Sequence, residues 1–174
     1  MKMTDKMIAD VLKDMVVVVD SREKSNSHIL SYFEKNDIPY FVEKMDTADY
    51  TFVLPNYPKL DLDYAILIER KNSIDEICGN FTKERDRFTR EFERVDQDCQ
   101  NVHILVEGAS WKKILNGTYR SKFPPKSLLA SLFTWNARYN CPIWFSDKSE
   151  AGMVIHQILY YELRECLSWL QKSS

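Results

Sequence analysis

Two acidic residues and one lysine have a spacing that could support hydrolysis of a phosphodiester bond. Glu69 and Lys71 follow an apolar run, and nineteen residues separate Asp49 from Glu69. Side chains alternate along a strand, so Glu69 and Lys71 should share one face and Arg70 should point to the other. Carboxylates of this kind suit Mg²⁺ or Mn²⁺, which bind through one or two carboxylates together with water and substrate phosphate. The lysine beside them could orient or help to deprotonate the attacking water.

The acidic residues meet only if the segments that carry them pair in one sheet. A hairpin between Tyr50–Leu54 and Ile66–Ile68 would bring Asp49 to the same face as Glu69. A divalent ion at that point would lower the pKa of bound water and neutralise charge that develops on the phosphate. A solvated, charged strand end is the competing interpretation, because an Asp and a Glu-x-Lys at this distance arise easily by chance.

The surrounding sequence alternates between apolar strands and amphipathic helices. Strands are predicted at Met15–Val19, Ile38–Val42, Tyr50–Leu54, Tyr64–Ile68, Val102–Val106 and Ile143–Phe145. Helices are predicted at 27–36, 72–79, 81–95, 111–115, 127–139 and 149–170, after a helical lead over residues 1–14. This order predicts an α/β fold, a three-layer sandwich with a central mixed β-sheet flanked by helices, and one domain over residues 15–174.

Composition and residue spacing argue against several classes of protein. The 174 residues are 44% hydrophobic and carry a net charge of −2, as expected for one folded domain and not for a strongly basic binder of polyanions. The four cysteines and three histidines have no metal-ligand spacing. We see no export signal and no apolar run of bilayer length. We therefore expect a protein that is not secreted and that works in the cytoplasm, on the nucleoid, or in the nucleus, with no membrane partner.

Short blocks around the candidate residues occur in an order that is typical of one enzyme family. The blocks are Val19-Asp-Ser-Arg-Glu23, Asp49, Glu69-Arg-Lys-Asn-Ser-Ile-Asp75, Arg87-Phe88 and Ile104-Leu-Val-Glu107. Together they resemble the nuclease domain of the XPF-type structure-specific endonucleases, whose signature is Gly-Asp, a variable gap, Glu-Arg-Lys, three residues and Asp. The resemblance implies a restriction-endonuclease-like fold in a stand-alone form, without the helix-hairpin-helix module that relatives commonly carry.

The resemblance also implies roles for single residues. Asp49 and Glu69 would hold Mg²⁺, for which Mn²⁺ should substitute, and Lys71 would act on the water or the phosphate. Further residues would complete the site, support it or contact DNA: Asp20, Glu23 and Arg70 as catalytic residues, Asp75 as a supporting residue, and Arg22 and Arg87 as DNA contacts. Ala48 stands where the family has glycine, which leaves open whether the turn before Asp49 is conventional or strained.

Structural roles could explain several of the same residues. Asp20 and Glu23 could cap a helix, and Asp75 could simply favour the dipole of the helix that follows Lys71. Glu107 is expected to be a surface group at a strand end.

Positive charge is concentrated in one segment. From Gly108 to Ser146 there are six basic residues and no acidic one. We expect Arg120, Lys122 and Lys126 to contact phosphates, with ordinary solvated charges as the alternative. No base-reading motif is present, so any selectivity should be for DNA shape.

These observations favour a metal-dependent DNA endonuclease that hydrolyses phosphodiester bonds at branched, flapped or forked DNA in recombination, repair or replication. A junction resolvase or a restriction-like nuclease is the nearest alternative. A non-catalytic DNA-binding scaffold subunit of a nuclease complex is an alternative from another class. A glycosidase with paired carboxylates would leave Lys71 and the basic segment without a role.

The carboxy-terminal helix predicts self-association. One apolar stripe at helical spacing should pack on the sheet, namely Ile155, Leu159, Leu163, Cys166 and Leu170. A second stripe lies on an adjoining face: Val154, Ile158, Tyr161 and Trp169. A helix that is apolar on two sides needs a second surface to cover, so we expect a homodimer. Packing within one chain is the alternative, and a protein partner could supply specificity.

Overall fold

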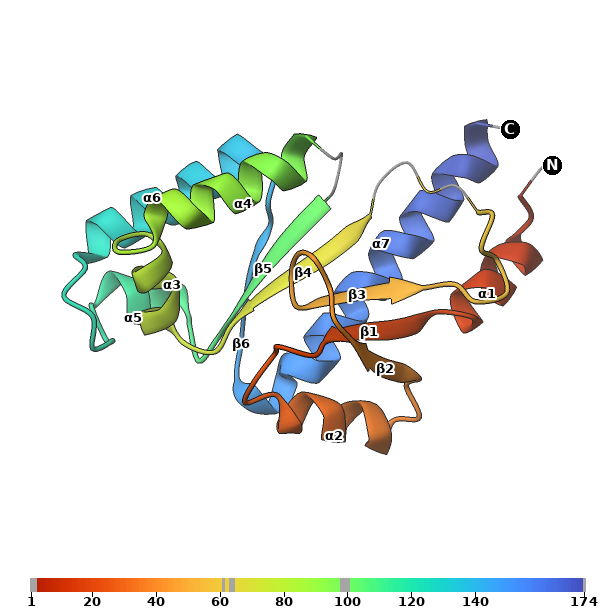
Figure 1. Ribbon diagram of the computed structural model, residues 1–174, viewed down its shortest axis with the longest axis horizontal. Coiled ribbons are helices and arrows are strands. Elements are labelled where there is room, and N and C mark those ends of the chain that lie inside the picture. The colour runs from red at the N-terminus through yellow and green to blue at the C-terminus, as the bar shows by residue number, and fades with distance from the viewer. Residues whose placement is uncertain (1–2, 61, 63–64, 98–100, 174) are drawn as a thin grey trace.

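The structure is a computed structural model that describes residues 3–60, 62, 65–97 and 101–173. Over these residues the centre is a six-stranded mixed β-sheet with helices on both faces (Figure 1). The strands are β1 (Val16–Asp20), β2 (Tyr40–Glu43), β3 (Tyr50–Val53), β4 (Ile66–Lys71), β5 (Asn101–Glu107) and β6 (Ile143–Ser146). The predicted α/β sandwich is confirmed. Tyr64, at which one predicted strand begins, and Cys99 lie outside the described residues.

The strands lie in the order β2-β1-β3-β4-β5-β6. β3 is antiparallel to both of its neighbours, and the other neighbouring pairs are parallel. The predicted hairpin therefore exists, with Tyr50 opposite Ile68. This pairing sets the register on which the candidate site depends.

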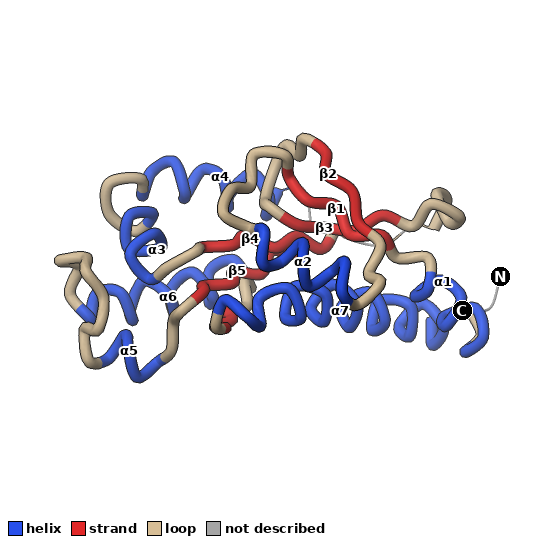
Figure 2. Tube along the Cα trace, turned by 90° about the horizontal axis from the view of Figure 1, so that it is seen from below, coloured by secondary structure: helices blue, strands red, loops and turns tan. Residues whose placement is uncertain are grey.

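The helices form two layers, one on each face of the sheet. One layer contains α1 (Asp5–Lys13), α2 (Ser27–Lys35) and α7 (Ala151–Ser173), which lie close together in Figure 2. The other contains α3 (Ile74–Asn80), α4 (Arg85–Gln97), α5 (Trp111–Leu115) and α6 (Pro125–Tyr139). A short 3-10 helix (Lys148–Glu150) precedes α7. None of the described helices is long and apolar enough to cross a membrane.

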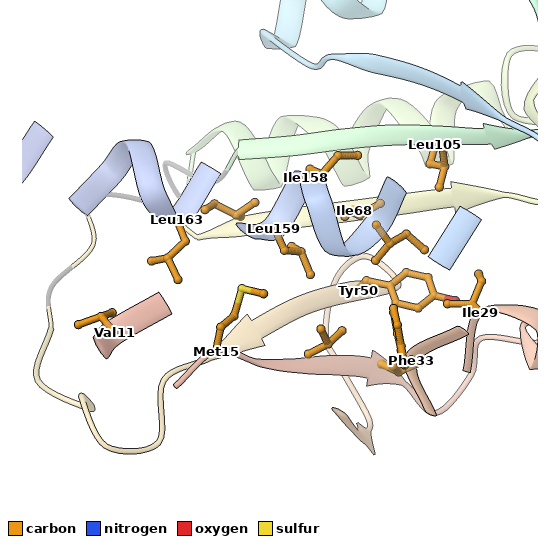
Figure 3. Close-up of a cluster of buried hydrophobic side chains, with 14 of the residues drawn as sticks. Val11, Met15, Ile29, Phe33, Tyr50, Ile68, Leu105, Ile158, Leu159 and Leu163 are labelled. Carbon is orange, nitrogen blue, oxygen red and sulfur yellow. The ribbon is translucent and has the colours of Figure 1, made fainter. Parts of the chain in front are cut away.

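Alternation along β4 decides which side chains face which layer. Ile66 and Ile68 pack into the core beneath α1, α2 and α7, whereas Leu67 packs into the core beneath α3, α4 and α6. Figure 3 shows the first of these two cores in close-up. Because the strand stays regular to its end, the Glu69 side chain lies on the same face of the sheet as Leu67. The Arg70 side chain lies on the same face as Ile68. α4 begins at Arg85, later than predicted, because the chain turns over residues 81–84 and buries Phe81 in the second core.

Candidate active site

Three carboxylates form one row at the end of the sheet. Val19 lies opposite Tyr50, which in turn lies opposite Ile68. One residue further toward this end of the sheet lie Asp20 at the end of β1, Asp49 just before β3, and Glu69 in β4. Backbone hydrogen bonds hold the row together, since the Asp20 amide donates to the Asp49 carbonyl at 2.9 Å and the Asp49 amide to the Ile68 carbonyl at 3.0 Å.

Lys71 shares the face of Glu69, as its position in the strand predicts. Its Nζ donates to Glu69 Oε1 at 2.5 Å and lies 5.3 Å from the centre of the Phe88 ring. Burial alone would lower the pKa of Lys71, but the Glu69 carboxylate outweighs it and raises the pKa above its ordinary value. Lys71 is therefore a buried cation at neutral pH, fixed beside a carboxylate.

Asp49 lies in a strongly negative environment. Its Oδ2 accepts a hydrogen bond from the Arg70 amide at 2.7 Å. Burial raises the pKa of Asp49 well above its ordinary value, and the carboxylates of Glu69 and Glu23 raise it further. A cation between Asp49 and Glu69 would relieve this repulsion.

Asp20 belongs to the row, but its oxygens are bound to Arg22. Oδ1 accepts from the Arg22 amide at 2.9 Å, and Oδ2 accepts from Arg22 Nη2 at 2.5 Å. The same Nη2 donates to the Met45 carbonyl at 2.5 Å, which ties the loop after β1 to the turn before Asp49. Burial opposes ionisation of Asp20, but the hydrogen bonds from Arg22 outweigh it and lower its pKa. In this arrangement Asp20 positions Arg22.

Arg70 points to the opposite face, as predicted. Its guanidinium forms ion pairs with Glu23 and with Glu107, the latter at 2.7 Å. The prediction that Glu107 is a surface group is wrong, since only 1% of the residue is exposed. The arginine makes this burial tolerable, because a carboxylate is buried only when it is paired.

A cavity of about 280 Å³ opens beside the carboxylate row. Asp20, Asp49 and Glu69 line one side of it, together with Arg22, and α4 lines the other with Arg87 and Arg94. Arg87 is exposed and pairs with Glu84 at 2.6 Å. Arg94 was not among the residues predicted from the sequence. Its position seven residues after Arg87, about two helical turns, was the available signal.

Asp75 and the predicted basic contacts are not among the residues that line this cavity. Asp75 Oδ1 accepts from the Ser121 amide at 2.6 Å, and its Oδ2 accepts from Arg120 Nε at 3.2 Å. Asp75 thereby fastens the loop between α5 and α6 to the first turn of α3, four residues after Lys71. The side chain of Arg120 is 90% exposed, and Lys122 and Lys126 are exposed nearby. The basic loop is thus held next to the end of β4.

The donor set fits a small divalent ion. In the described part of the chain, no three or more Asp, Glu, His or Cys side chains are placed so that they could bind one metal ion together. Asp49 and Glu69 are an oxygen pair, and Mg²⁺ is commonly held by one or two carboxylates, with water and substrate phosphate as its other ligands. The crowding of negative charge around Asp49 supports the same assignment.

The backbone conformation of Ala48 shows whether the turn before Asp49 is conventional or strained. Its φ is +63°, in the left-handed region that glycine adopts readily and alanine resists. The turn is therefore strained next to a candidate ligand, at a position that lines the cavity.

Replacing Ala48 with glycine should stabilise the protein by about 0.5–1 kcal/mol, because it removes the left-handed strain at the smaller cost of extra chain entropy. The midpoint of urea unfolding should rise without a change in slope. As a control, Ala9→Gly in the exposed part of α1 should destabilise by about 1 kcal/mol. A lower midpoint for Ala48→Gly would contradict the strain.

Residues 19–158 match the ERCC4 domain, and the chain belongs to that family. Among solved structures, XPF from Aeropyrum pernix is similar with a TM-score of 0.62 and 21% identity, over 84% of this chain and 61% of that chain. The same protein in complex with DNA gives a TM-score of 0.61 and 22% identity, over 86% and 66%. This chain thus spans less than two thirds of the length of either. No curated protein matches it significantly. The XPF-type resemblance and the restriction-endonuclease-like fold are confirmed.

Proposed function

We propose that this protein is an endonuclease that depends on Mg²⁺ or Mn²⁺ and hydrolyses phosphodiester bonds at branched, flapped or forked DNA, in recombination, repair or replication. The observation that carries the proposal is the Asp49–Glu69 pair with the buried cation Lys71 beside it. Membership of the ERCC4 domain family supports it. Such an enzyme would work where DNA is kept, on a nucleoid or in a nucleus.

Each group at the site has a task in this reaction. Asp49 and Glu69 would hold the ion, which when bound supplies a water of lowered pKa and positive charge beside the phosphate. Lys71, being protonated, can donate to a phosphate oxygen or orient the water, but it cannot accept a proton in that state. Arg22, Arg87 and Arg94 rim the cavity and would bind the neighbouring phosphates.

The substrate class can be tested with labelled single-stranded, duplex, flap, fork and four-way DNA, each with Mg²⁺ or with EDTA. We expect cleavage of the flap and fork substrates in Mg²⁺ only. Preference for four-way DNA would favour a junction resolvase, and preference for plain duplex a restriction-like nuclease. DNA binding without cleavage in either Mg²⁺ or Mn²⁺ would favour the non-catalytic scaffold subunit.

The basic loop should contribute phosphate contacts. Charge reversal of Arg120 and Lys122 together should weaken DNA binding and reduce the slope of log affinity against log salt by about two, roughly one for each lost contact. Fluorescence anisotropy across a salt series measures this slope. Reversal of Lys6 and Lys35, which are exposed on α1 and α2 in the other helical layer, is the matched control. An unchanged slope for the loop variant would place the DNA elsewhere.

We also propose that the protein forms a homodimer through the edge of the sheet at β6. Exposed apolar side chains gather on the elements around this edge: Trp111, Phe133, Trp144, Met153 and Tyr161. Edge strands are natural sites of association. A different protein partner at the same edge would be the heterodimeric alternative.

A further inference from the structure

A buried ionic network lies on the face of the sheet opposite the carboxylate row. Glu107, at the end of β5, accepts hydrogen bonds on Oε1 from Arg70 Nε at 2.7 Å and from His28 Nε2 at 2.8 Å. The side chains of Glu107 and Arg70 are 0% and 1% exposed. β4, β5 and α2 thus meet at one carboxylate oxygen.

Arg70 extends the network to the loop after β1. Its guanidinium pairs with Glu23 and donates to the carbonyls of Lys24 and Ser25 at 3.4 and 3.3 Å. Ser25 has a φ of +55°, which is unfavourable for a residue other than glycine. The loop is therefore held in a strained conformation by contacts to one side chain.

The same loop forms part of the cavity wall. Arg22 belongs to it and reaches the Met45 carbonyl, at the start of the turn that leads to Asp49. Asp49 itself accepts a hydrogen bond from the backbone amide of Arg70. Two routes therefore connect the Arg70 guanidinium to the carboxylate row, one through the loop and one through its own backbone.

Stability alone does not account for the carboxylate of Glu107. Its Oε2 is buried and has no hydrogen-bond partner among the described residues. An unsatisfied buried oxygen is destabilising, and buried ion pairs often stabilise less than apolar residues of the same volume. Burial of Glu107 is unfavourable, but the carboxylate holds the Arg70 guanidinium in one orientation. Orienting Arg70 therefore explains the presence of Glu107 better than a contribution to stability does.

We propose that Glu107 is a positioning residue for the active site, acting through Arg70 on the loop of residues 21–26 and the turn of residues 44–49. Its effect on catalysis rests on the proposed nuclease function. Its effect on the two segments does not.

Hydrogen exchange tests the structural half of the proposal. In Glu107→Ala, amides of residues 21–26 and 44–49 should exchange about tenfold faster, since local opening is no longer opposed by an oriented Arg70. Glu107→Gln keeps an oxygen that can accept from Arg70 Nε, so it should restore most of the protection. His103→Ala removes another buried polar side chain of β5, which contacts Trp144 and Glu162 instead, and should leave both segments protected.

Kinetics test the catalytic half. Glu107→Ala should lower the single-turnover cleavage rate about tenfold to a hundredfold with DNA affinity within about twofold of wild type, because small misplacement of catalytic groups acts mainly on the reaction step. His103→Ala should cleave at the wild-type rate. Unchanged exchange in both segments, or equal effects from His103→Ala, would overturn the proposal. A wild type that never cleaves DNA would reject the nuclease function alone. If the alanine variant fails to fold, Glu107→Gln decides the positioning role: a neutral amide binds Arg70 more weakly than a carboxylate, so both segments should exchange measurably faster than in wild type, and exchange equal to wild type would overturn the proposal.

Discussion

Replacing Lys71 with alanine should lower the rate of DNA cleavage by at least about a hundredfold, the typical loss when a preorganised charge is removed from beside a transition state. The ammonium is buried, fixed at 2.5 Å from Glu69, and charged, so no mobile side chain or solvent cation reproduces it. Asp49→Asn and Glu69→Gln should cause losses of at least the same size, because each removes a charged ligand from the proposed ion. EDTA should abolish activity in wild type.

The measurement is the single-turnover rate at saturating protein with Mg²⁺, beside DNA affinity and thermal unfolding. Lys35→Ala removes an exposed lysine on α2, in the other helical layer, and should leave the rate within about twofold. Asp49→Asn should also keep or slightly raise the unfolding temperature without metal, because it removes one of two crowded carboxylates. Full activity in EDTA or in Lys71→Ala would reject the metal-nuclease proposal.

Local pattern was sufficient to predict the centre of this site. The apolar runs fix both strands of the hairpin, and strict alternation then determines that Glu69 and Lys71 share a face while Arg70 leaves it. A pairing shifted by one residue would have sent Ile68 away from its core, so burial enforces the register that brings Asp49 beside Glu69.

Contacts between distant segments could not be predicted in the same way. Asp75 binds a loop 46 residues later, and Glu107 binds Arg70 at a separation of 37 residues. Such partners depend on which helix layer covers which end of the sheet, and charge spacing carries no information about that. A terminal acid on a strand looks identical in sequence whether water or an arginine covers it, which is why Glu107 was predicted to be exposed.

The carboxy-terminal helix shows a related limit. Ile158 belongs to the stripe predicted to face a second subunit, but it is only 6% exposed and packs in the core beneath α7. The buried surface of α7 is wider than a single stripe, and Leu167, outside both predicted stripes, is also fully buried. Tyr161 and Trp169 of the predicted outer stripe are exposed, at 49% and 57%. Periodicity therefore found two apolar faces, and the packing of α7 on the sheet moved the boundary between them.

Trp144→Asp and Tyr161→Asp should each weaken the proposed homodimer by at least about a hundredfold, or about 2.7 kcal/mol, the scale of an aromatic hot spot. Trp144 is 43% exposed on the edge strand β6, and its ring stacks on the buried His103. Tyr161 lines, with Trp144 and Met153, an apolar cavity of about 450 Å³ between β6 and α7. On the other side of β6, Trp111 packs against Phe145.

We expect a second copy of the chain to cover this surface. If a two-fold axis lies beside β6, the second copy covers the exposed apolar side chains on both faces of the sheet at that strand. Sedimentation equilibrium from about 0.1 to 100 µM should give twice the 20.6 kDa chain mass for wild type and a single chain for both variants, since a carboxylate buried without a partner is strongly disfavoured. Val42→Asp, at a 54% exposed position on β2, the opposite edge strand, is the matched control and should remain dimeric. A wild type that stays at one chain mass throughout would refute the dimer, and dissociation of Val42→Asp alone would place the interface at β2.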